Sequence, residues 1–80
     1  MLKIEDGDRY WYNEKDKLHR DDGPAIEGVG GIKMWIINNK RHRIDGPAVE
    51  YGSGAKEWWL NGKQYTEEEY KKKVKKHVKD

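Results

Sequence analysis

One nine-residue stretch occurs twice in this chain and decides its fold: HRDDGPAIE at residues 19–27 returns as HRIDGPAVE at residues 42–50. The match continues without an insertion, which sets the period at 23 residues, and a weaker first copy at residues 10–15 has two extra residues before His19. The further identical pairs are Lys33/Lys56, Trp35/Trp58, Asn38/Asn61 and Lys40/Lys63. Self-similarity at a fixed period predicts a repeat architecture, in which each unit buries its apolar face on its neighbours.

Each copy has the pattern of a β-hairpin followed by a turn. Runs rich in β-branched and aromatic residues alternate with Gly-rich loops, and Asn-Gly or Asp-Gly pairs supply the positive φ angles of tight turns. The expected strands are residues 2–5, 9–12, 24–27, 32–37, 47–51 and 55–60. We therefore predict a mainly β fold: three consecutive hairpin repeats in one twisted antiparallel sheet.

Alternation along the strands assigns residues to the two faces of this sheet. Tyr10, Trp35 and Trp58 occupy one aligned position, and Tyr12, Ile37 and Leu60 follow two residues later on the same face. Trp11, Ile36 and Trp59 then point to the other face. Because both faces are partly apolar, either a further element covers the second face or that face binds a partner.

The C-terminal segment has the pattern of an amphipathic helix. Thr66 and Glu69 have the spacing of a capping box, and Tyr70, Val74 and Val78 form a narrow apolar stripe. We expect this helix to cap the last repeat. The predicted organisation is a single domain with a degenerate first repeat (1–18), a second repeat (19–41), a third repeat (42–65) and the capping helix (66–80).

The composition is that of a small, highly charged domain. Charged residues make up 40% of the 80 residues and apolar residues 34%, so four Trp and five Tyr must supply much of the core. There is no Cys, which excludes a disulfide framework, and no apolar run has the length of a signal peptide or a membrane span. We expect a cytoplasmic protein with no membrane partner.

The sequence WIINNKRHRIDGPA, residues 35–48, resembles the variant MORN-type repeat. The form that carries His-Arg-x-Asp-Gly-Pro-Ala is similar to repeats of small proteins from bacteriophages and large DNA viruses. The resemblance covers residues 9–65, and the first copy departs from it because it lacks Asp-Gly-Pro. It implies a two-stranded unit and a role in protein interaction. It also implies a small phage-encoded accessory protein that engages a host protein, such as a defence component, in the host cytoplasm.

The repeated His and Asp residues have two interpretations. His19 with Asp22 and His42 with Asp45 have the spacing of a duplicated metal site or of acid/base pairs. The favoured interpretation is structural: Asp accepts a hydrogen bond from a turn amide, His bonds the same turn, and Pro begins a strand. We therefore expect a non-enzymatic protein with no catalytic residue, no metal and no cofactor. Gly28–Gly31 precede a strand rather than a helix, which favours a hairpin loop over a phosphate site.

Two kinds of binding surface remain open. Exposed aromatic residues beside arginines are typical of protein interfaces, and the residues predicted to bind a protein partner are Trp11, Trp59, Tyr51, Arg41 and Arg43. The alternative is an electrostatic binder of nucleic acid or free nucleotides, because residues 70–80 hold six Lys and one Asp. Its predicted basic surface comprises Lys72, Lys75, Lys76 and Lys79.

Overall fold

The computed structural model describes residues 1–78, which are predominantly β with one C-terminal helix, as predicted. The elements are β1 (Leu2–Glu5), β2 (Asp8–Trp11), β3 (Ile26–Glu27), β4 (Lys33–Met34), β5 (Ile36–Ile37), β6 (Lys40–Arg41), β7 (Val49–Glu50), β8 (Lys56–Leu60), β9 (Lys63–Tyr65) and α1 (Glu67–Val78). No helix within these residues combines the length and the apolar character that a membrane span requires.

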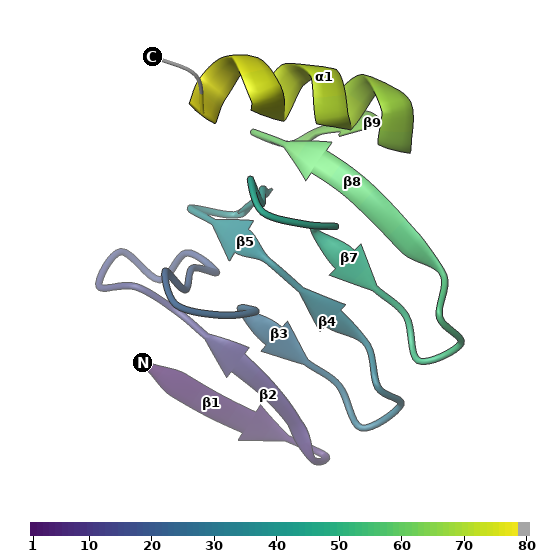
Figure 1. Ribbon diagram of the computed structural model, residues 1–80. Helices are drawn as coiled ribbons and strands as arrows, with labels where there is room; N and C mark the ends of the chain where they lie inside the picture. Colours follow the sequence, from purple (N-terminus) through teal and green to yellow (C-terminus); the bar gives the residue numbers. More distant parts are fainter. Residues whose placement is uncertain (79–80) are drawn as a thin grey trace.

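Seven strands form one antiparallel sheet in the order β1-β2-β3-β4-β7-β8-β9, and β5 and β6 form a separate two-stranded sheet (Figure 1). The expectation of six strands in a single sheet is therefore wrong. The strand predicted at residues 32–37 is interrupted at Trp35, so its second half pairs with β6.

Tight turns explain the additional hairpins. Asn38 and Asn39 have φ angles of 48° and 68°, and Asn61 and Gly62 have φ angles of 52° and 83°. Two successive residues at positive φ match the twist of a two-residue hairpin loop. Each return strand therefore continues into a second hairpin, β5–β6 in one case and β8–β9 in the other.

The strand register defines two faces of the seven-stranded sheet. Cross-strand partners lie on the same face, and one row of partners runs through Tyr10, Ile26, Met34, Val49 and Glu57. We call the side that carries this row the open face. Three tryptophans each follow a member of the row by one residue and point to the opposite side, which we call the covered face: Trp11, Trp35 and Trp58.

The predicted alignment of Tyr10 with Trp35 is wrong by one residue. Trp11 N–H donates to the Ala25 carbonyl at 2.9 Å, and Trp35 N–H donates to the Ala48 carbonyl at 2.7 Å. Trp11 therefore occupies the position that corresponds to Trp35. The sequence match failed here because the first copy lacks Asp-Gly-Pro, which fixes the register of the others.

A side chain sets the length of the loop in the first copy. Asn13 Oδ1 accepts hydrogen bonds from the backbone N–H groups of Lys15 at 2.9 Å and Lys17 at 3.1 Å. Asn13 N–H also donates to the Lys17 carbonyl at 2.9 Å, which closes the loop. With Trp11 as the equivalent of Trp35, this loop accounts for one extra residue before His19 rather than two.

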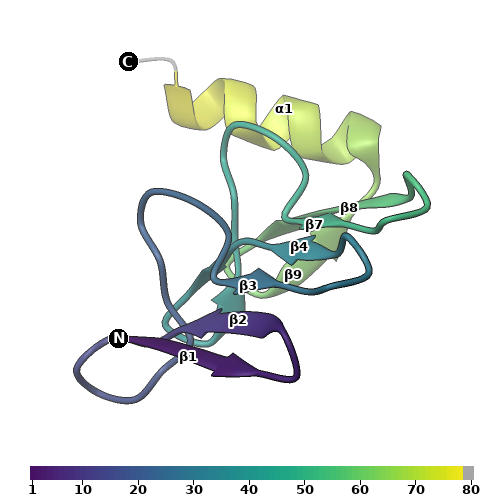
Figure 2. The same ribbon diagram turned by 90° about the horizontal axis from the view of Figure 1, so that it is seen from below.

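The elements that cover the sheet lie on one side of it. Helix α1 and the two loops that precede β3 and β7 rise from the same side, as Figure 2 shows. Tyr70 joins the helix to the second of these loops, because its hydroxyl donates to the Arg43 carbonyl and accepts from Gly46 N–H at 3.2 Å. The predicted capping box at the helix start is confirmed: Thr66 N–H donates to Glu69 Oε1 at 3.1 Å, and Glu69 N–H donates to Thr66 Oγ1 at 3.2 Å.

The core is small. Its buried apolar residues are Ala25, Ile36, Ala48, Val49, Leu60 and Tyr70. Trp35 and Trp58, two of the four Trp expected to supply much of the core, are half-buried. Arginine and tyrosine side chains, rather than a second apolar layer, cover these rings, as described below.

Close contacts at the hairpin loops hold neighbouring hairpins together. Gly52 lies so near the loop between β3 and β4 that a Cβ placed on it would be 2.0 Å from the Gly30 carbonyl oxygen. Gly30 itself has open space where its own Cβ would lie. Glycine is thus required at Gly52 for space, and the Gly28–Gly31 segment forms the predicted hairpin loop.

Candidate binding surface

An arginine stacks on a tryptophan at two places on the covered face. The Arg20 guanidinium lies 3.9 Å from the centre of the Trp11 ring, and the Arg43 guanidinium lies 3.6 Å from the centre of the Trp35 ring. A guanidinium over an aromatic ring is attracted by the negative face of the π-system and shields the ring from water. The arginines therefore close this face over the half-buried tryptophans.

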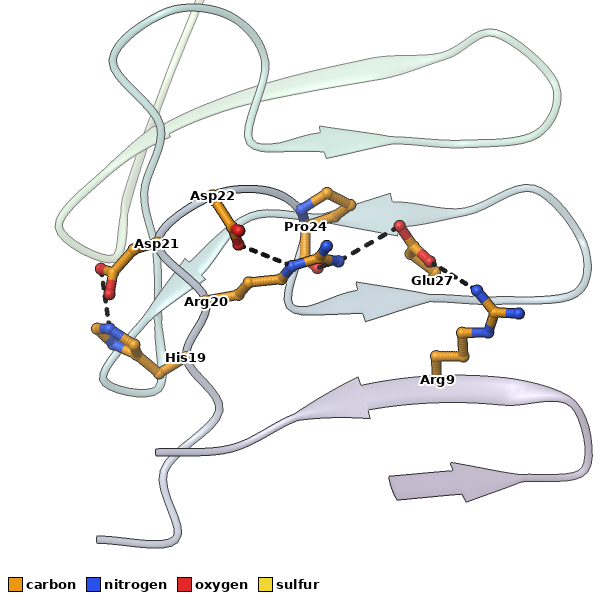
Figure 3. Close-up of polar contacts among 7 residues, drawn as sticks. All are labelled: Arg9, His19, Arg20, Asp21, Asp22, Pro24 and Glu27. Carbon is orange, nitrogen blue, oxygen red and sulfur yellow. Dashed lines mark hydrogen bonds and ion pairs between the residues drawn. The ribbon is translucent and has the colours of Figure 1, made fainter. Parts of the chain in front are cut away.

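The same hydrogen bonds fix both arginines. Arg20 Nε donates to Asp22 at 3.1 Å and its Nη1 donates to the Pro24 carbonyl at 3.1 Å, while Nη1 lies 3.6 Å from Glu27 (Figure 3). Arg43 repeats these contacts at 3.0 Å, 3.0 Å and 3.2 Å, with the partners Asp45, the Pro47 carbonyl and Glu50. The two turns are built alike.

The aspartates of these turns do not have the predicted partner. Asp22 and Asp45 were expected to accept a turn amide, whereas each accepts from the arginine two residues before it. A charge-assisted bond to a guanidinium holds that group in one plane. In both copies, the Asp-Gly-Pro turn thus orients an arginine over a tryptophan.

The histidines connect each turn to the following hairpin. His19 Nδ1 accepts the Asn38 N–H at 3.1 Å, and His42 Nδ1 accepts the Asn61 N–H at 3.0 Å. His19 Nε2 also lies 3.0 Å from Asp21. His19 thus contacts its own turn, as expected, and both histidines also accept a hydrogen bond from the turn of the following hairpin. Within residues 1–78, no group of three or more His, Cys, Asp or Glu could hold a metal ion.

Tyr70 takes the place of the arginine at the third tryptophan. Its ring lies 6.4 Å from the Trp58 ring, centre to centre, with a tilt of 53°. Burial raises the pKa of the Tyr70 hydroxyl above its ordinary value, with a further contribution from Asp45. The helix thus covers the end of the sheet where no further Asp-Gly-Pro turn follows.

The open face carries a groove of about 450 Å³ that none of these elements fills. Apolar side chains from several strands line its floor, with amide and basic groups around them. Its lining residues include Leu18, Ile26, Met34, Ile36, Arg41 and Trp59. Grooves of this size and character accommodate a small ligand or a few side chains of a partner.

A hydrogen-bonded cluster holds Trp59 in place beside this groove. Trp59 Nε1–H donates to Glu57 Oε1 at 2.9 Å, and the Tyr51 hydroxyl donates to Glu57 Oε2 at 2.8 Å. Both hydrogen bonds lower the pKa of the Glu57 carboxyl, and the one from Trp59 has the larger effect. The hydrogen bond to Glu57 in turn raises the pKa of the Tyr51 hydroxyl. The indole orientation is therefore fixed before any partner arrives.

The structure separates the residues predicted to bind a protein. Trp11 and Arg43 lie on the covered face in the two stacks. Trp59, Tyr51 and Arg41 come together on the open face, where the Arg41 guanidinium lies 4.8 Å from the centre of the Trp59 ring. Sequence reasoning missed Ile26, Met34 and Glu57, whose common row depends on a register that no sequence pattern states.

Three of the residues predicted to form a basic surface belong to helix α1: Lys72, Lys75 and Lys76. Lys72 and Lys75 are exposed, and Lys79 and the side chain of Lys76 fall outside the described residues. Neighbouring lysines are partly engaged: Lys71 pairs with Glu67 at 3.2 Å, and Lys73 lies 5.4 Å from the centre of the Tyr65 ring. Of this surface, the described side chains of Lys72 and Lys75 do not line the groove.

Known proteins give no further constraint on this surface. No family model, no curated protein and no solved structure matches the chain.

Proposed function

We propose that this chain is a non-enzymatic protein-binding module and that its open face is the interface. The observation that carries the proposal is the position of Trp59, a fixed aromatic ring beside an apolar groove that no other part of the described chain covers. Tryptophan in a partly enclosed site is enriched among the residues that dominate binding energy. A ring already oriented by Glu57 loses little conformational freedom on binding.

The proposal includes the finer architecture: three hairpin units at a 23-residue period, related to the variant MORN-type repeat. The duplicated arginine stacks support this reading, because Arg20 and Arg43 make the same contacts with the same spacing. By that resemblance we propose a small phage-encoded accessory protein that acts in the host cytoplasm on a host protein, such as a defence component.

Binding of nucleic acid or nucleotides is the competing function. Bases stack on free aromatic faces and phosphates pair with lysine, but Arg20, Arg43 and Tyr70 already cover three of the four tryptophans. The fourth, Trp59, has Arg41 over its ring and lines an apolar groove away from the described lysines of helix α1. These observations favour a protein partner.

The test is a selection of short peptides from a displayed random library on the immobilised protein. We expect selected peptides whose affinity falls about 30-fold or more in Trp59→Ala, with circular dichroism confirming the sheet. Double replacement of Lys72 and Lys75 by Gln is the matched control, and it should change the affinity little. Failure to select a peptide, or peptides that bind Trp59→Ala normally, would contradict the proposal. Salt-sensitive oligonucleotide binding that depends on the lysines would support the competing function.

A further inference from the structure

The charged side chains that line the groove in the described residues are all positive. Lys40 and Arg41 are its only charged lining residues in the described part of the chain, and both are cations. The polar groups beside them are uncharged: Asn39, Asn61 and the backbone of Gly62. Glu57 is not a lining residue; it accepts hydrogen bonds from Trp59 and Tyr51, and its charge also interacts with that of Arg41.

Arg41 differs from the other two arginines that lie on tryptophan rings. Nε of Arg20 and Nε of Arg43 each donate to an aspartate two residues later. Nε of Arg41 is buried and has no hydrogen-bond partner within the described residues. Because solvent does not reach Nε, an incoming acceptor can meet Arg41 only at the outer Nη groups of its guanidinium.

We infer that the groove binds an acidic segment of the partner protein: an apolar side chain enters between Met34 and Trp59, and an adjacent Asp or Glu carboxylate pairs with the outer edge of the Arg41 guanidinium. This inference rests on the proposed function and specifies the chemistry of the partner. The apolar floor supplies affinity through burial, whereas the pair of cations selects for negative charge and against basic segments.

The groove favours a peptide carboxylate over a polyphosphate. Its floor is formed by Ile26, Met34 and Ile36, which offer nothing to a chain of charged groups. The Arg41 guanidinium lies over the Trp59 ring and its Nε is buried, so the outer Nη groups are the donors left for an acceptor. One carboxylate next to one apolar side chain matches this arrangement.

A double-mutant cycle tests the inference. We would measure, by fluorescence anisotropy, the binding of a selected peptide and of its Glu→Gln or Asp→Asn counterpart to the parent protein and to Arg41→Gln. We expect the peptide change to weaken binding about tenfold to the parent protein and less than about twofold to Arg41→Gln, as for a direct charge pair. Lys72→Gln is the matched control, because it removes a positive charge outside the groove and should leave the tenfold difference intact.

Each outcome distinguishes this inference from the proposed function. If Arg41→Gln did not fold, the same cycle with Lys40→Gln would show a coupling of the same sign at a smaller size. Selected peptides without acidic residues, or an equal effect of the peptide change on both proteins, would overturn the inference while leaving an interface at Trp59. Peptides that bind Trp59→Ala as well as the parent would instead overturn the proposed function. Displacement of the peptide by an oligonucleotide would also contradict the inference.

Discussion

The two faces of the sheet use the same residue types in opposite ways. On the covered face, Arg43 stacks on Trp35 and donates hydrogen bonds to Asp45, the Pro47 carbonyl and Glu50. On the open face, Arg41 lies over Trp59 and its buried Nε has no partner within residues 1–78. The contrast shows that an arginine–tryptophan pair stabilises the fold where an aspartate also bonds the arginine. Where no aspartate bonds it, as at Arg41, the arginine keeps hydrogen-bonding capacity for a partner.

The largest effect should follow from removing the element that closes the covered face. Tyr70 is 4% exposed and joins the helix to Trp58 and to the loop before β7. Tyr70→Ala should therefore cost about 3–5 kcal/mol, enough to unfold much of so small a domain. Urea denaturation checks this, with Tyr70→Phe retaining most of the stability. The comparison would fail if Trp59→Ala destabilised the protein more than Tyr70→Ala did.

A second variant tests whether the loops of neighbouring hairpins must pack closely against each other. Gly52→Ala places a Cβ 2.0 Å from the Gly30 carbonyl oxygen, and such overpacking should cost about 1–3 kcal/mol. Gly30→Ala is the control, because nothing lies near its Cβ position, and it should change the stability by less than about 0.5 kcal/mol. Equal melting temperatures for the two variants would show that the loops do not touch.

The features of the fold that depend on local sequence could be predicted. The capping box, the positive-φ turns and the mainly β class depend on local signals, and each was predicted correctly from residues such as Thr66 and Asn61. The roles of Arg20 and Arg43 were not, because a stack on a distant tryptophan depends on where the turn folds back. The register of the first copy also failed, because Trp11 and Tyr10 are adjacent aromatic residues and only hydrogen bonding distinguishes them.

The placement of the predicted binding residues on two opposite faces could not be predicted either, because it depends on the same register. Trp11 and Trp59 were expected to point the same way, and a shift of one residue in the first copy reverses the face of Trp11. The sequence predicted either a covering element or a partner for an apolar face; the loops and helix α1 cover one face, and a partner for the other stays a prediction. The identity of that face follows only from the side on which the loops and helix α1 lie.

Replacing one arginine on each face compares the faces directly, with a smaller expected loss of stability. Arg43→Gln removes a stacked, hydrogen-bonded cation and should cost about 1.5 kcal/mol. Arg41→Gln should cost less than about 0.5 kcal/mol, because the buried Nε of Arg41 contributes no hydrogen bond to the fold. Chemical denaturation of both variants measures the difference. A larger loss in Arg41→Gln would mean that Arg41 has a structural role.

The smallest expected effect is a pH dependence at Glu57. Hydrogen bonds from Trp59 and Tyr51 lower its pKa below the ordinary 4.5, so the folded state holds the charged form more strongly than the unfolded state does. The resulting stability is present above about pH 4.5 and is lost as the pH falls through the lower pKa of the folded state. Glu57→Gln should therefore show a shallower loss of stability on acidification. Identical acid profiles for the two proteins would contradict the hydrogen-bonded cluster.

The most direct test of the central claim is a ¹H–¹⁵N NMR titration of the protein with a selected acidic peptide. If the open face is the interface, the largest shifts will fall on Ile26, Met34, Ile36, Arg41 and the Trp59 indole, while the resonances of Arg20, Arg43 and Tyr70 will change little. Shifts concentrated on the two Asp-Gly-Pro turns or on Lys71–Lys75 of the helix would contradict the account.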